Sequence, residues 1–146
     1  TTQLNGINTT TLDALSVAKL STTQVTGLTT TTFGNLTATQ ISTLTATEIA
    51  ALSTGNINQL TTTEISAFTA TQVGGLTSTQ IGAMATTRFD AITSTTGIPA
   101  ISVAAIAGLT TAEISSLSTT QGNAFTPTQI EAMSIAQLDA LITLVG

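Results

Sequence analysis

Few side chains in this sequence could do chemistry, and none of them form a recognisable catalytic pattern. The chain of 146 residues contains no cysteine and no histidine, which removes thiolate chemistry, the usual zinc ligands and the commonest general base. Serine and threonine are abundant, but nothing present could activate them as nucleophiles. No glycine-rich phosphate-binding loop appears. We therefore expect no enzyme activity, no catalytic, cofactor-binding or metal-binding residues, and no cofactor.

The seven acidic residues are the remaining candidates for chemistry. Carboxylates that are spread along a repeat array do not converge on one substrate, as general acid–base catalysis would need. Glu48, Glu64 and Glu113 share one position of a repeated phrase and are interpreted as helix caps. Asp13 is predicted to be a helix N-cap. The other acidic residues are predicted to be solvated: Asp90, Glu131 and Asp139.

The charge balance argues against two kinds of partner. Lys19 and Arg88 are the only basic residues, and the net charge is −5, so a phosphate-binding surface for nucleic acid is not expected. The most apolar run, 98–109, is far shorter than a membrane-spanning helix. We expect no membrane span, and we expect this run to continue the core.

The elements that position these side chains come from an eight-residue repeat. Between 36 and 92 it reads LTATQIST, LTATEIAA, LSTGNINQ, LTTTEISA, FTATQVGG, LTSTQIGA and MATTRFDA. Position 1 of each octad is a large apolar residue, position 6 is apolar in most octads, and position 8 is usually small. The same frame runs almost from end to end, which is typical of a repeat array.

Positions 2 and 5 determine the expected secondary structure. Position 2 carries a short side-chain oxygen that could cap a helix N-terminus. The predicted N-caps are Asn5, Asp13, Ser21, Thr29, Thr37, Thr45, Ser53, Thr61, Thr69, Thr77, Thr93, Ser102, Thr110, Ser118, Thr126 and Ser134. Position 5, three residues later, completes a capping box in Gln24, Gln40, Glu48, Glu64, Gln72, Gln80, Glu113, Gln121, Gln129 and Gln137. Positions 1 and 6 then form a hydrophobic staple, and Pro127 falls at the first helical position.

This pattern predicts an all-α solenoid or superhelix of very short capped helices, one in each octad. A single long helix is excluded because eight residues turn through about 800°, so an apolar stripe would slip around the surface. A β-solenoid is the alternative, since Thr, Ile and Val favour strands. In an unbroken strand, however, positions 1 and 6 would face opposite sides. Short helices are the preferred prediction.

The array is expected to be one continuous unit over 1–146, with one irregularity. The unit ITSTTGIPA at 92–100 has nine residues rather than eight. Thr96-Gly97 has turn chemistry, and Pro99 disfavours helical geometry at Ile98. We expect a local break there, with regular octads on either side.

The phrase LTxxQIxAL in tandem resembles the Thr/Ser–Gln octad tracts of very large bacterial surface and secreted proteins of the adhesin-like or haemolysin-like kind. The resemblance implies an extracellular or cell-surface location and a role as a stalk, spacer or fibre. It brings no catalytic residues with it. The alternative is a binding module in which rows of threonine contact glycans, ice or another surface.

The expected partner is another copy of the chain. The last residues, Leu141 to Gly146, are apolar and lack a cap at Ile142, and such an end is not expected to face water. Either the chain is cut from a longer array, or its C-terminal coil stacks on the N-terminal coil of another copy. Head-to-tail stacking of that kind would generate filaments, and the low charge leaves little repulsion against lateral association. Exposed threonines at positions 3 and 4 are possible sites of O-glycans.

Overall fold

The computed structural model describes residues 2–146, and these residues contain helices and turns but no strand. The prediction of an all-α array of short helices is confirmed, and the β-solenoid alternative is wrong. The α-helices are α1 (Thr2–Asn5), α2 (Thr9–Asp13), α3 (Thr22–Thr26), α4 (Thr30–Gly34), α5 (Ala38–Ser42), α6 (Ala46–Ala51), α7 (Thr54–Ile57), α8 (Thr62–Ser66), α9 (Ala70–Gly74), α10 (Ser78–Gly82), α11 (Thr86–Phe89), α12 (Val103–Ile106), α13 (Thr111–Ser116), α14 (Thr119–Gly122), α15 (Pro127–Glu131) and α16 (Ile135–Val145). Two short 3₁₀ helices are η1 (Val17–Lys19) and η2 (Ile98–Ala100).

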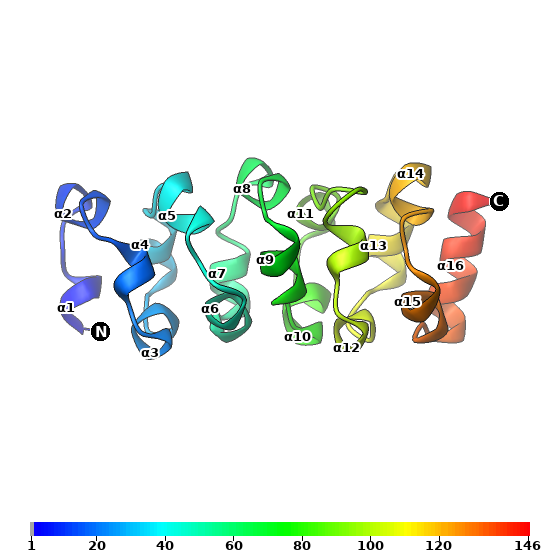
Figure 1. The fold of residues 1–146 in the computed structure, drawn as a ribbon, viewed down its shortest axis with the longest axis horizontal. Coiled ribbons are helices and arrows are strands. Elements are labelled where there is room, and N and C mark those ends of the chain that lie inside the picture. Colours follow the sequence, from blue (N-terminus) through cyan, green and yellow to red (C-terminus); the bar gives the residue numbers. More distant parts are fainter. Residues whose placement is uncertain (1) are drawn as a thin grey trace.

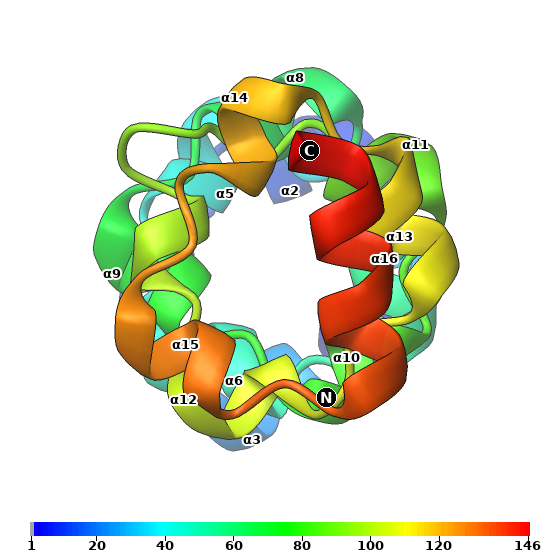
Figure 2. The ribbon, with the colours of Figure 1, turned by 90° about the vertical axis from the view of Figure 1, so that its right-hand side faces the viewer.

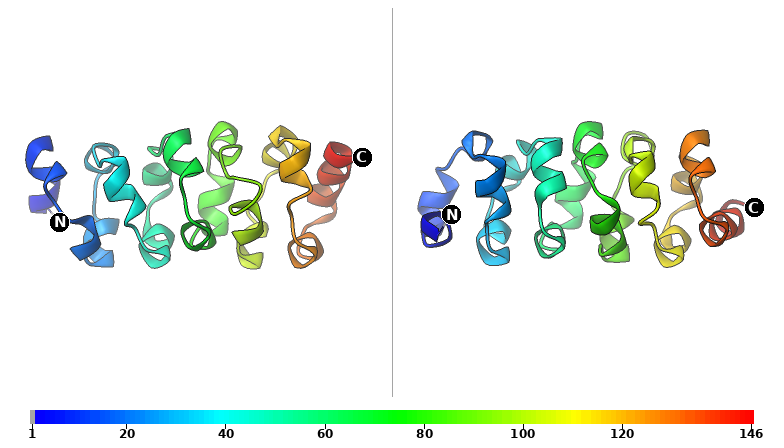
Figure 3. Two further views of the ribbon diagram at one scale, coloured as in Figure 1. Left: turned by 45° about the horizontal axis from the view of Figure 1, so that its top comes forward. Right: turned by 90° about the horizontal axis from the view of Figure 1, so that it is seen from below.

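The helices wind into a superhelix that forms an elongated rod (Figures 1 and 3). Viewed down the long axis, successive helices follow one another around a ring (Figure 2). From α3 onward, helices pack against the helix that lies about three octads further along the chain, as α3 does on α6 and α6 on α9. Stacked coils therefore take the place of the neighbouring layers of an ordinary domain.

The helices begin where the position-2 caps predict. The side-chain oxygen of the cap accepts the backbone N–H three residues later at Ser21, Thr29, Thr37, Thr45, Ser53, Thr61, Thr69, Thr77, Thr110, Ser118, Thr126 and Ser134. Every predicted capping box is also formed, at Gln24, Gln40, Glu48, Glu64, Gln72, Gln80, Glu113, Gln121, Gln129 and Gln137. Pro127 is the first residue of α15, where its missing N–H has no helical partner to lose.

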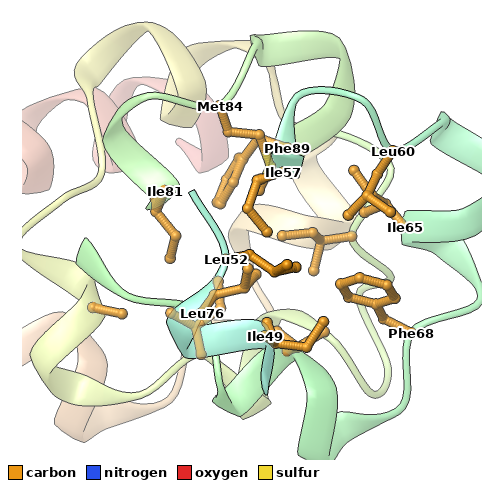
Figure 4. Packing of buried hydrophobic residues seen from close by; sticks show 14 of the residues in the cluster. Ile49, Leu52, Ile57, Leu60, Ile65, Phe68, Leu76, Ile81, Met84 and Phe89 are labelled. Carbon is orange, nitrogen blue, oxygen red and sulfur yellow. The ribbon is translucent and has the colours of Figure 1, made fainter. Parts of the chain in front are cut away.

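Positions 1 and 6 build a single core along the axis of the rod. Their side chains fill the centre of the ring, and Figure 4 shows Leu52, Ile57, Ile81 and Phe89 meeting there from different coils. One octad contributes too little apolar surface to offset the entropy of ordering its own backbone, at roughly 1–2 kcal/mol per residue. The short helices are thus stable only as part of the stack.

The predicted frame is wrong in the first octads. Asn5 and Asp13 are not N-caps; they are the last residues of α1 and α2. Asn8 caps α2 instead, with its Oδ1 accepting the N–H of Thr11. Neither octad has Gln or Glu at position 5 to complete a capping box. Asn8, three residues after Asn5, starts α2, so that Asp13 falls at the end of this helix.

The irregular unit at 92–100 contains a turn at 94–97 and the 3₁₀ helix η2 but no α-helix. The prediction that Thr93 is a helix N-cap is wrong, because its hydroxyl and carbonyl oxygens accept the N–H of Gly97 in a turn. Pro99 lies within η2 and has no N–H to donate. Just beyond, Ser102 occupies the N-cap position of α12 without a side-chain hydrogen bond.

The coils approach most closely where residues are small. A Cβ at Gly108 would lie 2.0 Å from the carbonyl oxygen of Ser78, and one at Gly75 would lie 2.5 Å from that of Ala46. Both contacts join a position-8 glycine to the backbone of another coil. The preference for small residues at position 8 therefore reflects the spacing between coils.

A candidate functional site between the coils

The position-5 glutamine joins two coils while it caps its own helix. In the octad of α9, the Oε1 of Gln72 accepts the N–H of Thr69 at 3.0 Å. Its Nε2 donates to the carbonyl oxygens of Ile41 and Leu44, each at 3.1 Å, on the preceding coil. A buried amide is stable only when its donors and acceptors are paired. This single side chain therefore pairs both ends of its amide and satisfies backbone groups of two coils.

The same contact recurs along the rod. Amide nitrogens at position 5 donate to carbonyl oxygens of the preceding coil at 2.7 to 2.9 Å in Gln40, Gln80, Gln121, Gln129 and Gln137. In Gln72, Gln80, Gln129 and Gln137 the acceptors lie 28 and 31 residues earlier. One coil of the superhelix therefore takes between three and four octads. We refer to these side chains as the inter-coil glutamines.

A glutamate at position 5 keeps the cap and loses the inter-coil bond. The Oε2 of Glu113 accepts the N–H of Thr110 at 2.7 Å and its hydroxyl at 2.8 Å. Its Oε1 is buried and has no hydrogen-bond partner. Burial, opposed by the hydrogen bonds from Thr110 and assisted by the charge of Asp90, raises the pKa of Glu113 above its ordinary value of 4.5.

Asn56 keeps the hydrogen bond to the preceding coil and lacks the one to its own cap. Its Nδ2 donates to the carbonyl oxygen of Leu28, which lies 28 residues earlier, at 3.2 Å. Its Oδ1 is buried without a partner, and the α7 octad has no capping box although Ser53 accepts the N–H of Asn56. The side chain is one methylene shorter than glutamine, so it reaches the neighbouring coil but not the N–H of its own cap.

Two octads that lack a capping box, those of α4 and α11, are supported by asparagines of the preceding coil. The Oδ1 of Asn5 accepts the N–H of Thr29, and the Oδ1 of Asn58 accepts the N–H of Ala85. The Nδ2 of Asn5 donates to the carbonyl oxygen of Gly27, and the Nδ2 of Asn58 donates to that of Ala83. Cap N–H groups are thus paired from outside where no position-5 oxygen is available.

Arg88 is the one cationic side chain at position 5. Its Nε donates to the carbonyl oxygen of Leu60, 28 residues earlier, at 2.8 Å. The guanidinium group therefore fulfils the donor role of an inter-coil glutamine. It has no acceptor for a cap N–H, which Asn58 supplies at Ala85.

The remaining acidic residues are mostly on the surface. Glu131, Asp139 and Asp13 are exposed. Asp90 is half-buried rather than freely solvated, and its carboxylate accepts the hydroxyl of Ser116 on the next coil at 2.6 Å. Within 2–146 no group of three or more acidic side chains lies close enough together to hold a metal ion.

A shallow surface groove of about 480 Å³ crosses several coils. Small and hydroxyl-bearing residues line it, including Ala46, Gly75, Ser78 and Ala105. It contains no acid, base or thiol that could act on a substrate.

Within residues 2–146, none of the helices has the length and the apolar character that a membrane-spanning helix needs.

The sequence identified the caps but not the links between coils. The capping-box pattern does not distinguish Gln from Glu at position 5, since both side chains complete the box. The signal that could have found the link was the predominance of Gln over Glu. An amide still offers a donor once its oxygen is engaged at the cap, whereas an ionised carboxylate does not.

The fold and these contacts define a class of repeat protein, an octad solenoid of capped helices joined by inter-coil glutamines. A family model described as the ALTTAQ repeat matches residues 49–86, from within α6 to the start of α11. Those six letters correspond to positions 8 and 1 to 5 of the octad, which read AFTATQ at 67–72. The match supports a repeat-containing protein. Comparisons with curated proteins and with solved structures gave no match.

Proposed function

We propose that this chain is a structural repeat protein that serves as an extracellular fibre subunit or surface stalk and associates with copies of itself. The observation that carries the proposal is the series of position-5 side chains that donate to the preceding coil, which are the six inter-coil glutamines between Gln40 and Gln137 together with Asn56 and Arg88. A rod built this way sets a distance without presenting a reactive site. The described residues offer no assembled catalytic groups, so we propose no enzymatic role.

The end of the rod formed by α16 supports self-association. This helix lies across the end that faces the viewer in Figure 2. Its Ile135 is 89% exposed and its Ile142 is 57% exposed. Two large aliphatic side chains on one short element form an apolar surface that another copy could cover. Contact between this end and the opposite end of another copy would be heterologous and would extend the rod.

The extracellular location is proposed from the resemblance to bacterial surface tracts. Exposed threonine hydroxyls at positions 3 and 4, such as those of Thr63 and Thr71, would be accessible to O-glycosylation in that setting. Antibody labelling of intact producing cells tests the location, and the mass of the chain from its native source tests the glycosylation.

The alternative, a binding module that uses rows of threonine, has less support. Ice binding would need a flat threonine array at strand spacing, and here the threonines lie on separate short helices. Glycan binding by the exposed hydroxyls is tested by a glycan-array measurement, in which saturable binding would favour the module.

Self-association is tested by light scattering and electron microscopy of the purified chain over a range of concentrations. We expect a mass that rises with concentration and thin rods longer than one chain. The variant carrying Ile135→Ser and Ile142→Ser should stay closer to monomer. Val103→Ser is the matched control, since Val103 is also exposed but lies on α12, away from α16.

A concentration-independent monomer for the unaltered chain would contradict self-association. Equal loss of assembly in the Val103→Ser chain would show that association is lateral and does not use the α16 end.

A further inference from the structure

We propose that Glu113 forms a pH-dependent hydrogen bond between two coils. In its protonated form, its Oε1 donates to a backbone carbonyl of the preceding coil. Protonation would convert the carboxylate into a group with one acceptor and one donor, the same pair that the amide of an inter-coil glutamine provides. The inference is independent of whether the rod is extracellular or self-associating.

The position of the carboxyl group carries the proposal. The side chain is 1% exposed. One oxygen, Oε2, accepts both the N–H and the hydroxyl of Thr110. The other, Oε1, is buried without a partner. A buried oxygen without a partner destabilises the folded chain, and more so when the group is charged.

The repeat register indicates which carbonyl groups face Oε1. Gln80 donates to Ile49 and Leu52, at positions 6 and 1 of earlier octads. The unit at 92–100 adds one residue between Glu113 and its acceptors, so the equivalent groups are the carbonyls of Ile81 and Met84. An ionised carboxylate would be repelled by these oxygens, whereas a protonated one could donate to either.

The charged groups around Glu113 favour the protonated form. Helix α13 packs against α11 and α16. The α11 segment brings Asp90, whose negative charge opposes ionisation, and Arg88, whose Nε is engaged with the carbonyl of Leu60. The α16 helix brings Asp139, which is exposed. The flanking helices α12 and α14 carry no charged residue.

The direction of the pH effect follows from the folded-state pKa, which desolvation raises above 4.5. A carboxyl group whose pKa is raised on folding binds its proton more tightly in the folded state. Its contribution to stability is complete below the ordinary pKa and is lost as the pH rises through the folded-state value. The inter-coil contact at Glu113 is therefore present in acid and absent well above that value.

The test compares the full chain with Glu113→Gln and Glu64→Gln by urea unfolding between about pH 4 and about pH 8. Glu64 has the same capping box but is only partly buried, so its variant is the matched control. We expect Glu113→Gln to raise the folded-to-unfolded ratio at neutral pH about fivefold or more. This gain should shrink as the pH falls, and at neutral pH it should exceed the effect of Glu64→Gln, since the unpaired buried oxygen belongs to Glu113.

A pH profile of Glu113→Gln that is parallel to that of the unaltered chain would overturn the proposal. A second measurement does not depend on any variant. The ¹³Cδ resonance of Glu113 in the unaltered folded chain should titrate with a midpoint above the ordinary glutamate value of 4.5, and a midpoint at or below that value would also overturn the proposal.

Discussion

At the scale of single residues, the fold depends on the position-5 glutamine, whose amide oxygen and amide nitrogen must both be hydrogen-bonded. Glutamine at position 5 has an acceptor for the cap N–H and a donor for the preceding coil, as Gln72 shows. Glu113 keeps the acceptor and leaves an oxygen unpaired, while Asn56 keeps the donor and leaves its own oxygen unpaired. The three residues are chemically similar, but only glutamine has the length and the polarity to satisfy both sides.

Replacing Asn56 by glutamine should stabilise the chain. The longer side chain could accept the N–H of Ser53 and still donate to the carbonyl of Leu28, completing the capping box that α7 lacks. We expect a gain of about 0.5–1.5 kcal/mol in the free energy of unfolding, measured by urea denaturation. Asn35→Gln is the control, because Asn35 is exposed. A loss of stability in Asn56→Gln would mean that the extra methylene does not fit between the coils.

At the scale of the helix, the caps determine where each element begins. An isolated helix of four to six residues is unstable in water, so the start must be specified locally and the remaining stability must come from the stack. In α8 (Thr62–Ser66), Thr61 accepts the N–H of Glu64, and Glu64 in turn accepts the N–H of Thr61. The octad pattern therefore specifies the boundaries, while the neighbouring coils supply the stability.

Thr61→Ala should destabilise the chain more than Thr63→Ala. The first change removes the cap oxygen of α8 and should cost about 0.5–2 kcal/mol. Thr63 is exposed within the helix, so its loss should cost much less. Thermal and urea unfolding of the two variants provide the comparison. Equal losses would show that the cap bond at Thr61 contributes nothing specific.

Helix positions could be predicted from the sequence because capping is local. The signal at Thr69 and Gln72, for example, lies within four residues and has a clear stereochemical meaning. The prediction failed at Asn5 and Asp13 because Asn8 caps α2, and these two residues end α1 and α2. Thr29 and Ser53 cap their helices without a Gln or Glu at position 5, so the absence of a capping box does not by itself displace the frame.

The contacts between coils could not be predicted in the same way. An octad specifies its own bend but not how many octads complete one coil, so the partners of Gln72 at Ile41 and Leu44 were not apparent. That number depends on the summed angles of several turns and on how closely small residues such as Gly108 let the backbones approach. The unpaired Oε1 of Glu113 became visible only once the coils were in place.

At the scale of the whole molecule, position-5 side chains such as Gln40, Gln72 and Gln137 join one coil to the preceding one. The core runs along the axis, and its apolar contacts supply most of the attraction. The inter-coil glutamines fix the register, since each one pairs with particular carbonyl groups. Disturbing one link should therefore affect two coils that are far apart in the sequence.

The most direct test is hydrogen exchange of the Gln72→Glu chain, followed by mass spectrometry at neutral pH. This change keeps the cap acceptor and removes only the donor to Ile41 and Leu44. Gln24→Glu is the control, because Gln24 forms a capping box but lies in the first coil of the described chain.

We predict faster exchange in residues 38–51, on the preceding coil, as well as in residues 68–75, where the change is made. The control should change exchange only near its own octad. If Gln72→Glu affected residues 68–75 alone and left 38–51 as protected as before, position 5 would be a local cap and the account of linked coils would be wrong.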